Sequence, residues 1–342
     1  MKKIKKKSKG INKLQKIIIS LFALLVVVFG LLFYGPWHGF RDFWITTAMT
    51  TLSHQYLATW LYSEDTINKV LEGNKVLEPE EDSNMDLIDI VSDKGSNVIY
   101  KDEYDKQVLE HDKNDIYKYF KVEGYNFDAY MAVIYDPSKV SVVHTKYLGY
   151  DGQYLVDMAK DEGAVVAING GGFLDQDGEG SGGQPVGIVI DDGKIINSAS
   201  NSGGLIGFTN DNKLFLGYVS ANEAINMGIR DAVEFGPFLI VNGKKANIKG
   251  NGGYGIHPRS AIGQRQDGVV LFLVIDGRRV DSMGASMADV LDIMVKYGAY
   301  NAANLDGGNS SVLVINNKIV NRPIDWYQRE QTRKIATGFI VK

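Results

Sequence analysis

The stretch SMADVLDIMVKYGAYNAANLDGG, residues 286–308, contains the pattern that decides the fold. Its first half repeats apolar residues with the spacing of one helix face. Ser286 is a suitable N-cap for this helix, and Gly298 is a natural end for it. A strand is predicted at 301–305 directly after the helix, and another at 269–275 before it. Strand, helix and strand in this order predict a crossover connection within a mixed β-sheet.

Short apolar runs separated by glycine continue this pattern from residue 116 onward. The chain has 38 Gly against 7 Pro, which suits many tight turns between strands. A further helix is predicted at 151–161. We therefore predict an α+β fold, with a mixed β-sheet core and a few packed helices, preceded by an N-terminal transmembrane helix. Other strands are predicted at 129–135, 140–144, 164–168, 186–190, 205–208, 213–216, 238–241, 261–263, 312–315 and 335–341.

Residues 17–34, IIISLFALLVVVFGLLFY, are almost wholly apolar. At ~1.5 Å per residue a helix of this length reaches about 27 Å, close to the thickness of a bilayer core. Eight lysines precede it, and the positive-inside rule keeps that end in the cytoplasm. We predict a single-pass signal-anchor in the cell membrane, with the rest of the chain extracytoplasmic. A cleaved signal peptide is the alternative, but the run is long and no small-x-small site follows it.

The composition divides the chain into five parts. Residues 40–70 are predicted to form a helix, which lies on the membrane surface, acts as a stalk or packs on a neighbour. Residues 74–115 are rich in charged residues and are predicted to be a spacer. The parts are a cytoplasmic basic tail (1–16), a transmembrane anchor (17–35), a juxtamembrane helix (36–73), a charged linker (74–115) and a globular domain (116–342).

Composition also excludes several classes of site. The chain has no Cys, so disulfides, thiolate metal sites and thiol nucleophiles are excluded. Beyond Lys16 there are 29 basic and 41 acidic residues, a formal charge of −12. This balance lacks the basic footprint of a nucleic-acid-binding protein. An anionic substrate would therefore need a few well-placed arginines.

Four loops that follow short apolar strands carry the residues suited to chemistry. In the first, Asn169, Gly170 and Gly171 expose backbone N–H groups that suit a phosphate or a sugar oxygen, although a tight turn explains them equally well. In the second, Arg259 is a natural bidentate partner for phosphate, and His257 suits acid–base chemistry. Taken alone, such an Arg is more often a surface ion-pair residue, and such a His is more often structural.

The other two loops each place an aspartate at the end of a strand. Asp276 is followed by Arg278, and Asp306 opens the run Asp306-Gly307-Gly308-Asn309-Ser310. Such an aspartate acts as a ligand or a base, or simply forms a turn. The two glycines allow a ligand to approach the backbone closely. The sequence around Ser310 lacks the Gly-x-Ser-x-Gly pattern of an elbow-type nucleophile.

A separate acidic loop contains Asp175, Asp177 and Glu179. Alternating oxygen ligands with glycine suit Ca²⁺, but the full twelve-residue EF-hand pattern is missing. A solvated acidic turn is the simpler interpretation. The sequence requires no cofactor.

Taken in order, these loops resemble the signature of the phosphodiester glycosidase family, over about residues 125–342. The likeness rests on the Asn-Gly-Gly loop at Asn169 with Phe173, Gly236-Pro237 before a strand, Pro-Arg-Ser-Ala-Ile-Gly at 258–263, and Asn-Leu-Asp-Gly-Gly at 304–308 before Ser310 and Ser311. Two positions depart from the usual pattern: Gly172 stands where Phe is more common, and Asn309 where a third Gly is common.

The resemblance implies that residues 116–342 form a hydrolase that cleaves the glycosidic bond of a sugar-1-phosphodiester, in a surface glycan or related polymer such as an exopolysaccharide. Its partners would be this substrate and the lipid bilayer, without nucleic acid. Catalysis would fall to Asp306 and Asp276, with His257 as a proton donor. The substrate phosphate would be held by Arg259, Arg278 and the glycine loops with Asn309 and Ser310. The alternatives are a hydrolase of peptidoglycan or teichoic acid on the same fold, and a non-catalytic protein of glycan binding or exopolysaccharide assembly.

Overall fold

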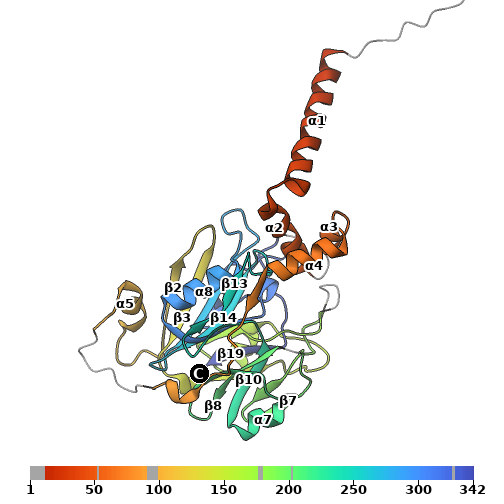
Figure 1. The fold of residues 1–342 in the computed structure, drawn as a ribbon. Coiled ribbons are helices and arrows are strands. Elements are labelled where there is room, and N and C mark those ends of the chain that lie inside the picture. Colours follow the sequence, from red (N-terminus) through yellow and green to blue (C-terminus); the bar gives the residue numbers. More distant parts are fainter. Residues whose placement is uncertain (1–11, 52–53, 91–98, 176–179, 202, 326–327) are drawn as a thin grey trace, which may run out of the picture.

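Three β-sheets enclose a shared apolar core, and helices cover their outer faces (Figure 1). The computed structural model describes residues 12–51, 54–90, 99–175, 180–201, 203–325 and 328–342. The architecture confirms the predicted α+β class. The helices are α1 (Lys13–Tyr34), α2 (His38–Met49), α3 (Tyr56–Thr59), α4 (Glu64–Gly73), α5 (Glu103–Leu109), α6 (Leu155–Asp161), α7 (Ala221–Asn226) and α8 (Met287–Lys296).

The largest sheet has seven strands, in the order β12-β11-β16-β14-β15-β3-β2. It contains β2 (Tyr117–Glu123), β3 (Asp128–Ile134), β11 (Phe238–Val241), β12 (Lys244–Lys245), β14 (Arg259–Arg265), β15 (Val270–Ile275) and β16 (Ala299–Leu305). The next sheet, in the order β18-β17-β5-β19-β4, contains β4 (Val140–His144), β5 (Val166–Asn169), β17 (Leu313–Ile315), β18 (Lys318–Ile319) and β19 (Thr337–Val341).

The third sheet has the order β7-β6-β10-β8-β9, and a small two-stranded sheet joins β1 to β13. All strand pairs within the described residues are antiparallel, which is more uniform than the mixed sheet expected. These strands are β1 (Lys75–Leu77), β6 (Val189–Asp191), β7 (Lys194–Asn197), β8 (Gly204–Thr209), β9 (Leu214–Gly217), β10 (Ile229–Phe235) and β13 (Asn247–Lys249).

The central strands are buried on both faces, which explains their continuous apolar runs. In β3, Tyr130, Ala132 and Ile134 face the shared core. The alternate residues Met131 and Val133 belong to a second core, between the seven-stranded sheet and helices α5 and α8. Helices α6 and α7 cover the other two sheets in the same way.

Helix α8 forms where the sequence predicts it. Ser286 and Asp289 make a capping box, and the face that includes Met287, Val290 and Met294 is buried against the seven-stranded sheet. Strands β15 and β16, before and after α8, both pair antiparallel with β14 between them and so run parallel to each other. The helix therefore connects two parallel strands of one sheet, as a crossover does.

The single helix predicted over 40–70 is divided into α2, α3 and α4. Helix α2 ends at Met49, and the hydroxyl of Thr50 donates to the carbonyl of Thr46. Ser63 then caps a new helix, because its side chain accepts from the N–H of Thr66. The predicted single helix is corrected to a three-helix module, which packs around its own small core.

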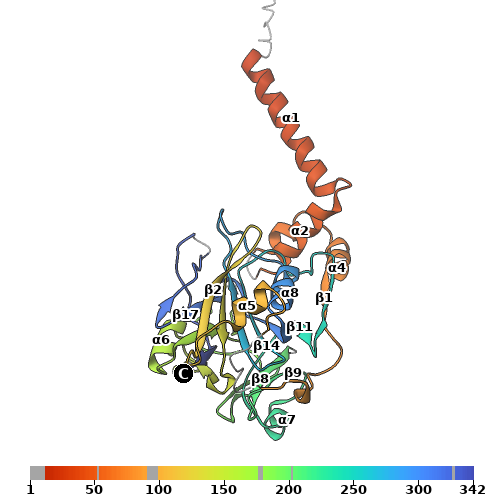
Figure 2. The ribbon, with the colours of Figure 1, turned by 90° about the vertical axis from the view of Figure 1, so that its left-hand side faces the viewer.

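Helix α1 is the one helix in the described part of the chain that is long and apolar enough to cross a membrane, judged by length and composition. It leaves the globular body without packing along it (Figures 1 and 2). Its residues from Leu14 to Phe29 are exposed apolar side chains almost throughout. Its last turn differs, since Phe33 is buried in the three-helix module.

The segment predicted as a spacer contacts the globular domain at several points. Strand β1 pairs with β13, and the N–H of Ser83 donates to the carbonyl of Leu216 at 2.8 Å. Further along, Asp105 in α5 forms a buried ion pair with Arg265 of β14 at 2.7 Å. The described part of 74–115 is therefore attached to the fold rather than held away from it. These contacts could not be predicted from the charged composition of the segment, because charged residues are usually exposed and are buried here only as ion pairs.

We predict that Asp105→Ala lowers the free energy of unfolding by about 3 kcal/mol, because it removes one partner of a buried ion pair. Arg265 would keep only Asp267 and the carbonyl of Tyr297 as partners. Denaturant unfolding of the purified chain measures the change. Glu103→Ala, in the first turn of the same helix, is the matched control and should change stability little. Equal effects of both variants would contradict a specific role for the Asp105 ion pair.

Candidate active site

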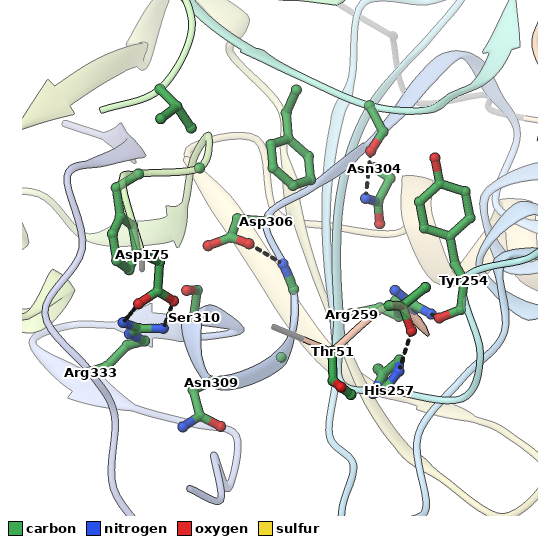
Figure 3. A pocket seen from close by; sticks show the side chains of 18 of the residues that line it. Thr51, Asp175, Tyr254, His257, Arg259, Asn304, Asp306, Asn309, Ser310 and Arg333 are labelled. Atoms are coloured by element: carbon green, nitrogen blue, oxygen red, sulfur yellow. Dashed lines mark hydrogen bonds and ion pairs between the residues drawn. The ribbon is translucent and has the colours of Figure 1, made fainter. Parts of the chain in front are cut away.

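A cavity of about 350 Å³ lies where loops from the seven-stranded sheet meet loops from the β4–β19 sheet (Figure 3). It combines the carboxyl group of Asp306 with three guanidinium groups and several small or aromatic residues. The lining residues are Thr50, Thr51, Gly172, Phe173, Asp175, Val186, Phe235, Gly236, Tyr254, His257, Arg259, Arg278, Asn304, Asp306, Gly307, Gly308, Asn309, Ser310 and Arg333.

Asp306 lies at the cavity wall directly after β16, as the sequence predicts. Burial raises the pKa of its carboxyl to about 6, although a hydrogen bond with Ser310 and the charge of Arg333 act in the opposite direction. The N–H of Gly307 donates to Oδ1 at 2.9 Å. A carboxyl group with this pKa exchanges protons readily near neutral pH, so it suits acid–base work.

Arg259 begins β14, and its side chain is 6% exposed. Its Nε donates to the carbonyl of Ala285 at 3.1 Å, and Nη2 donates to those of Tyr254 and Gly255 at 2.7 and 2.8 Å. Within the described residues no carboxylate forms an ion pair with it. Burial lowers its pKa to about 10, so it remains charged at neutral pH. The cavity thus contains a cation that is oriented by neutral carbonyls and suits an anionic ligand.

Two more arginines extend this positive lining. Arg278 contacts Asn309 through a hydrogen bond from Nη1, and burial, with the nearby charge of Arg333, lowers its pKa to about 10. Arg333 forms an ion pair with Asp175 at 2.5 Å and lies over the ring of Phe173. Arg333 is not among the predicted site residues; the available signal was its position just before the last predicted strand, at 335–341.

His257 also lines the cavity, but it is uncharged. Burial, together with the charges of Arg259 and Arg278, lowers its pKa to about 3. Its Nε2 lies 3.1 Å from the hydroxyl of Thr50 at the end of α2. A neutral imidazole with this pKa is a poor proton donor at neutral pH. Its geometry fits a hydrogen-bonding role better than the acid role predicted.

Asn169, Gly170 and Gly171, predicted to bind substrate, are not among the residues that line the cavity, but Asn169 and Gly170 hold the backbone of Asp306. The Asn169 amide donates to the carbonyl of Asp306 at 2.6 Å, and its oxygen accepts from the hydroxyl of Ser260 at 2.7 Å. The N–H of Asp306 in turn donates to the carbonyl of Gly170 at 3.1 Å. A Cβ at Gly171 would come within 2.9 Å of a backbone carbonyl oxygen, so close packing explains the glycine.

Asp276, predicted to be catalytic, is not among the residues that line the cavity. It is 1% exposed, and its oxygens accept from the amide of Asn321 and the N–H of Arg322 at 2.9–3.0 Å. The guanidinium of Arg279 is a further partner at 3.2 Å. We therefore assign Asp276 to the framework that holds the neighbouring loops.

The run from Gly307 to Ser310, which is predicted to bind the substrate, lines the cavity, and Gly308–Ser310 form a short 3-10 turn. Gly308 has φ +61°, and an added Cβ would meet Arg278 at 3.0 Å. Glycine at this position therefore permits both the turn and the close approach of the guanidinium.

The predicted calcium loop falls partly outside the described residues, because Asp177 and Glu179 lie in the gap at 176–179. Both oxygens of Asp175 bind Arg333, at 2.5 and 2.9 Å. Among the residues that the structure describes, no group of three or more His, Cys, Asp or Glu could hold a metal ion. The ion pair with Arg333 therefore explains the position of Asp175.

Several lining residues gave no signal in the sequence. Thr50 and Thr51 belong to the three-helix module, more than 200 residues before His257, and they reach the cavity through the docking of that module. Tyr254 lies three residues before His257 and also had no sequence signal. Asn304 differs, because it is the first residue of the Asn-Leu-Asp-Gly-Gly motif, although it was not among the predicted site residues. The side-chain oxygen of Asn304 is buried and has no hydrogen-bond partner within the described residues, which makes it a candidate for ligand recognition.

Comparison with known proteins gives the family. The sequence model of the phosphodiester glycosidase family matches residues 162–342. A SPbeta prophage-derived uncharacterized protein, YomE, of Bacillus subtilis (strain 168) is 30% identical over 213 residues, covering 57% of this chain and 31% of that protein. The N-acetylglucosamine-1-phosphodiester α-N-acetylglucosaminidase of Bos taurus is 27% identical over 198 residues, covering 52% and 36%. The match thus spans about a third of the length of these curated relatives.

Solved structures show the same fold. The catalytic domain of the zebrafish N-acetylglucosamine-1-phosphodiester α-N-acetylglucosaminidase matches with a TM-score of 0.56 and 20% identity, over 82% of this chain and 99% of that one. A hypothetical protein from Synechocystis matches with a TM-score of 0.53 and 17% identity, over 66% and 62%. Because the family model covers more than half of the sequence, this chain belongs to the phosphodiester glycosidase family.

Proposed function

We propose that this chain is a hydrolase that cleaves the glycosidic bond of a sugar-1-phosphodiester, with Asp306 as its catalytic carboxyl group. One observation carries the proposal: a carboxyl group with a pKa of about 6 faces Arg259, Arg278 and Arg333 in a single cavity. The curated relatives named as glycosidases of N-acetylglucosamine-1-phosphodiesters support this class of substrate.

The arrangement of charge fits the two ends of such a substrate. The cationic groups suit the phosphate, and the carboxyl group suits the positive charge that develops on the sugar ring in the transition state. The second pKa of a phosphate monoester is about 6, so it is a good leaving group and needs little help from an acid. Asp306 is therefore needed chiefly as a carboxylate.

In this reaction the bond between the anomeric carbon and the phosphate oxygen breaks, and its electron pair stays on that oxygen. The oxygen of a water molecule bonds to the anomeric carbon. The proton from this water passes to Asp306 and then to the departing phosphate or to solvent. The products are a free sugar and a phosphate monoester, and Arg259 and Arg278 stabilise the charge gained by the phosphate.

We further propose that α1 anchors the chain in a membrane with the domain on the extracytoplasmic side. Support comes from its exposed apolar surface and from the lysines that precede it. A sugar phosphodiester of the cell surface is the substrate class that this placement favours.

Asp306→Asn should lower kcat by about 10²–10⁴-fold, because the variant keeps the shape of the side chain but cannot carry a proton or a negative charge. Release of free N-acetylglucosamine from a water-soluble N-acetylglucosamine-1-phosphodiester by the detergent-solubilised full chain is the assay. If the parent protein is folded and releases no sugar, the hydrolase proposal fails. Retained binding of the diester under that outcome would favour the glycan-binding alternative.

The pH dependence of kcat/KM tests the form in which Asp306 acts. Below its pKa of about 6 the carboxyl group is protonated and above it the carboxylate predominates. We therefore expect kcat/KM to rise with pH through about 6 and then level off. A profile that falls above pH 6 would instead assign Asp306 the role of an acid.

Arg259→Lys should lower kcat/KM by about 10–100-fold, because lysine keeps the charge but cannot make the carbonyl contacts through Nε and Nη2 that orient the guanidinium in the cavity. A neutral sugar that inhibits the enzyme does not contact a phosphate site. The substitution should therefore weaken its inhibition less than it lowers kcat/KM for the diester. Arg322→Lys replaces an arginine that does not line the cavity, and it should leave kcat/KM unchanged. Equal losses in both variants would argue against a phosphate site at Arg259.

Asp276→Asn separates a framework role from a catalytic one. Since Asp276 accepts from Asn321, Arg322 and Arg279 while buried, we expect a loss of about 3 kcal/mol in the free energy of unfolding. The folded fraction should keep a kcat close to that of the parent. A stable variant with the kinetic defect of Asp306→Asn would restore Asp276 to the catalytic set.

A further inference from the structure

The cavity lies at the end of the domain from which α1 departs. Thr50 and Thr51, in the cavity wall, directly follow α2, and α2 is separated from α1 only by residues 35–37. Helix α2 has 12 residues, so at ~1.5 Å per residue about 18 Å at most separates its ends. The cavity wall is therefore close to the point where the apolar helix ends.

The connection between α1 and the domain is packed rather than loose. Phe33 at the end of α1 is buried, and its carbonyl accepts from the hydroxyl of Tyr62 at 2.9 Å. The hydroxyl of Tyr34 donates to the carbonyl of Leu61 at 2.9 Å. These contacts fix the end of α1 relative to the three-helix module.

The module is in turn joined to the loop that precedes Arg259. Asn251 donates from its side chain to the hydroxyl of Thr46 and from its N–H to the side chain of Asn74, each at 2.9 Å. Thr50 meets His257 further along the same loop. The distance between the cavity and the end of α1 is thus fixed by structure.

The same end of the domain exposes apolar side chains on loop tips. Tyr125, between β2 and β3, is 87% exposed, and Val280, between β15 and α8, is fully exposed. The two loops contact each other, since the N–H of Met283 donates to the carbonyl of Asn126. In Figures 1 and 2 the β2–β3 turn and the loop after β15 rise beside α2, toward α1. Arg278, which lines the cavity, belongs to the second of these loops.

We propose that this loop end rests on the membrane surface, and that the substrate is a glycosyl phosphodiester whose second ester arm is a membrane lipid. The inference rests on the proposed function and specifies its substrate class. Exposed aromatic and apolar side chains next to an apolar helix are typical of a surface at the headgroup level. The formal charge of −12 beyond Lys16 gives the domain no general attraction to an anionic surface, so these tips must supply the contact.

The test compares two substrates that share the same sugar and phosphodiester. One is methyl N-acetylglucosamine-1-phosphodiester in water, and the other carries a hexadecyl arm and is embedded in phosphatidylcholine vesicles that contain the full chain. We expect the double variant Tyr125→Ser/Val280→Ser to lose about tenfold in kcat/KM on the embedded diester and nothing on the methyl diester. The matched control, Ile195→Ser/Met227→Ser, changes exposed apolar residues of β7 and of the end of α7, which lie at the opposite end of the domain in Figure 1. It should affect neither substrate.

The outcomes separate this inference from the function on which it rests. Hydrolysis of the methyl diester without faster hydrolysis of the embedded one overturns the lipid substrate and leaves the proposed function intact. Preference for a water-soluble sugar-phosphate polymer over the embedded diester does the same. Equal losses from both double variants overturn the membrane contact. Failure on every diester by folded protein overturns the hydrolase itself, and the inference with it.

Discussion

The side-chain amide of Asn169 joins the two sheets on whose meeting the whole cavity depends. Its nitrogen donates to the carbonyl of Asp306 after β16, and its oxygen accepts from Ser260 of β14 and from the N–H of Val312 before β17. Strands β14 and β16 belong to the seven-stranded sheet, whereas β5 and β17 belong to the other. A buried amide that uses both its donor and its acceptor is strongly oriented. It fixes Asp306 relative to the arginines on the neighbouring loops.

Burial acts in one direction on four ionisable groups around the cavity. It raises the pKa of Asp306 and lowers the pKa of His257, Arg259 and Arg278, so each group is moved toward its neutral form. A bound anion reduces the electrostatic cost of the charged guanidinium groups, which couples ligand binding to the protonation of the site.

Much of the sheet core could be predicted because its strands and α8 have clear periodicity. Strand β10 was missed, since Asp231 and Glu234 interrupt its apolar run; both are buried, and both accept hydrogen bonds from backbone N–H groups. Asp276 and Asp306 present the same local pattern, a strand followed by Asp-Gly. Only the tertiary partners of Asp276 distinguish them. Thr50 and Arg333 reach the cavity through packing between distant segments, which no local pattern reveals.

The packed junction at Phe33 has a mechanical consequence. A helix in a bilayer tilts when its apolar length exceeds the thickness of the hydrocarbon layer. Helix α1 has 22 residues, about 33 Å at ~1.5 Å per residue, and its last turn packs into the three-helix module through Phe33. With α1 in a membrane, a change in its tilt would rotate the attached domain relative to the membrane surface. The thickness of the bilayer would then determine the direction in which the cavity is aimed.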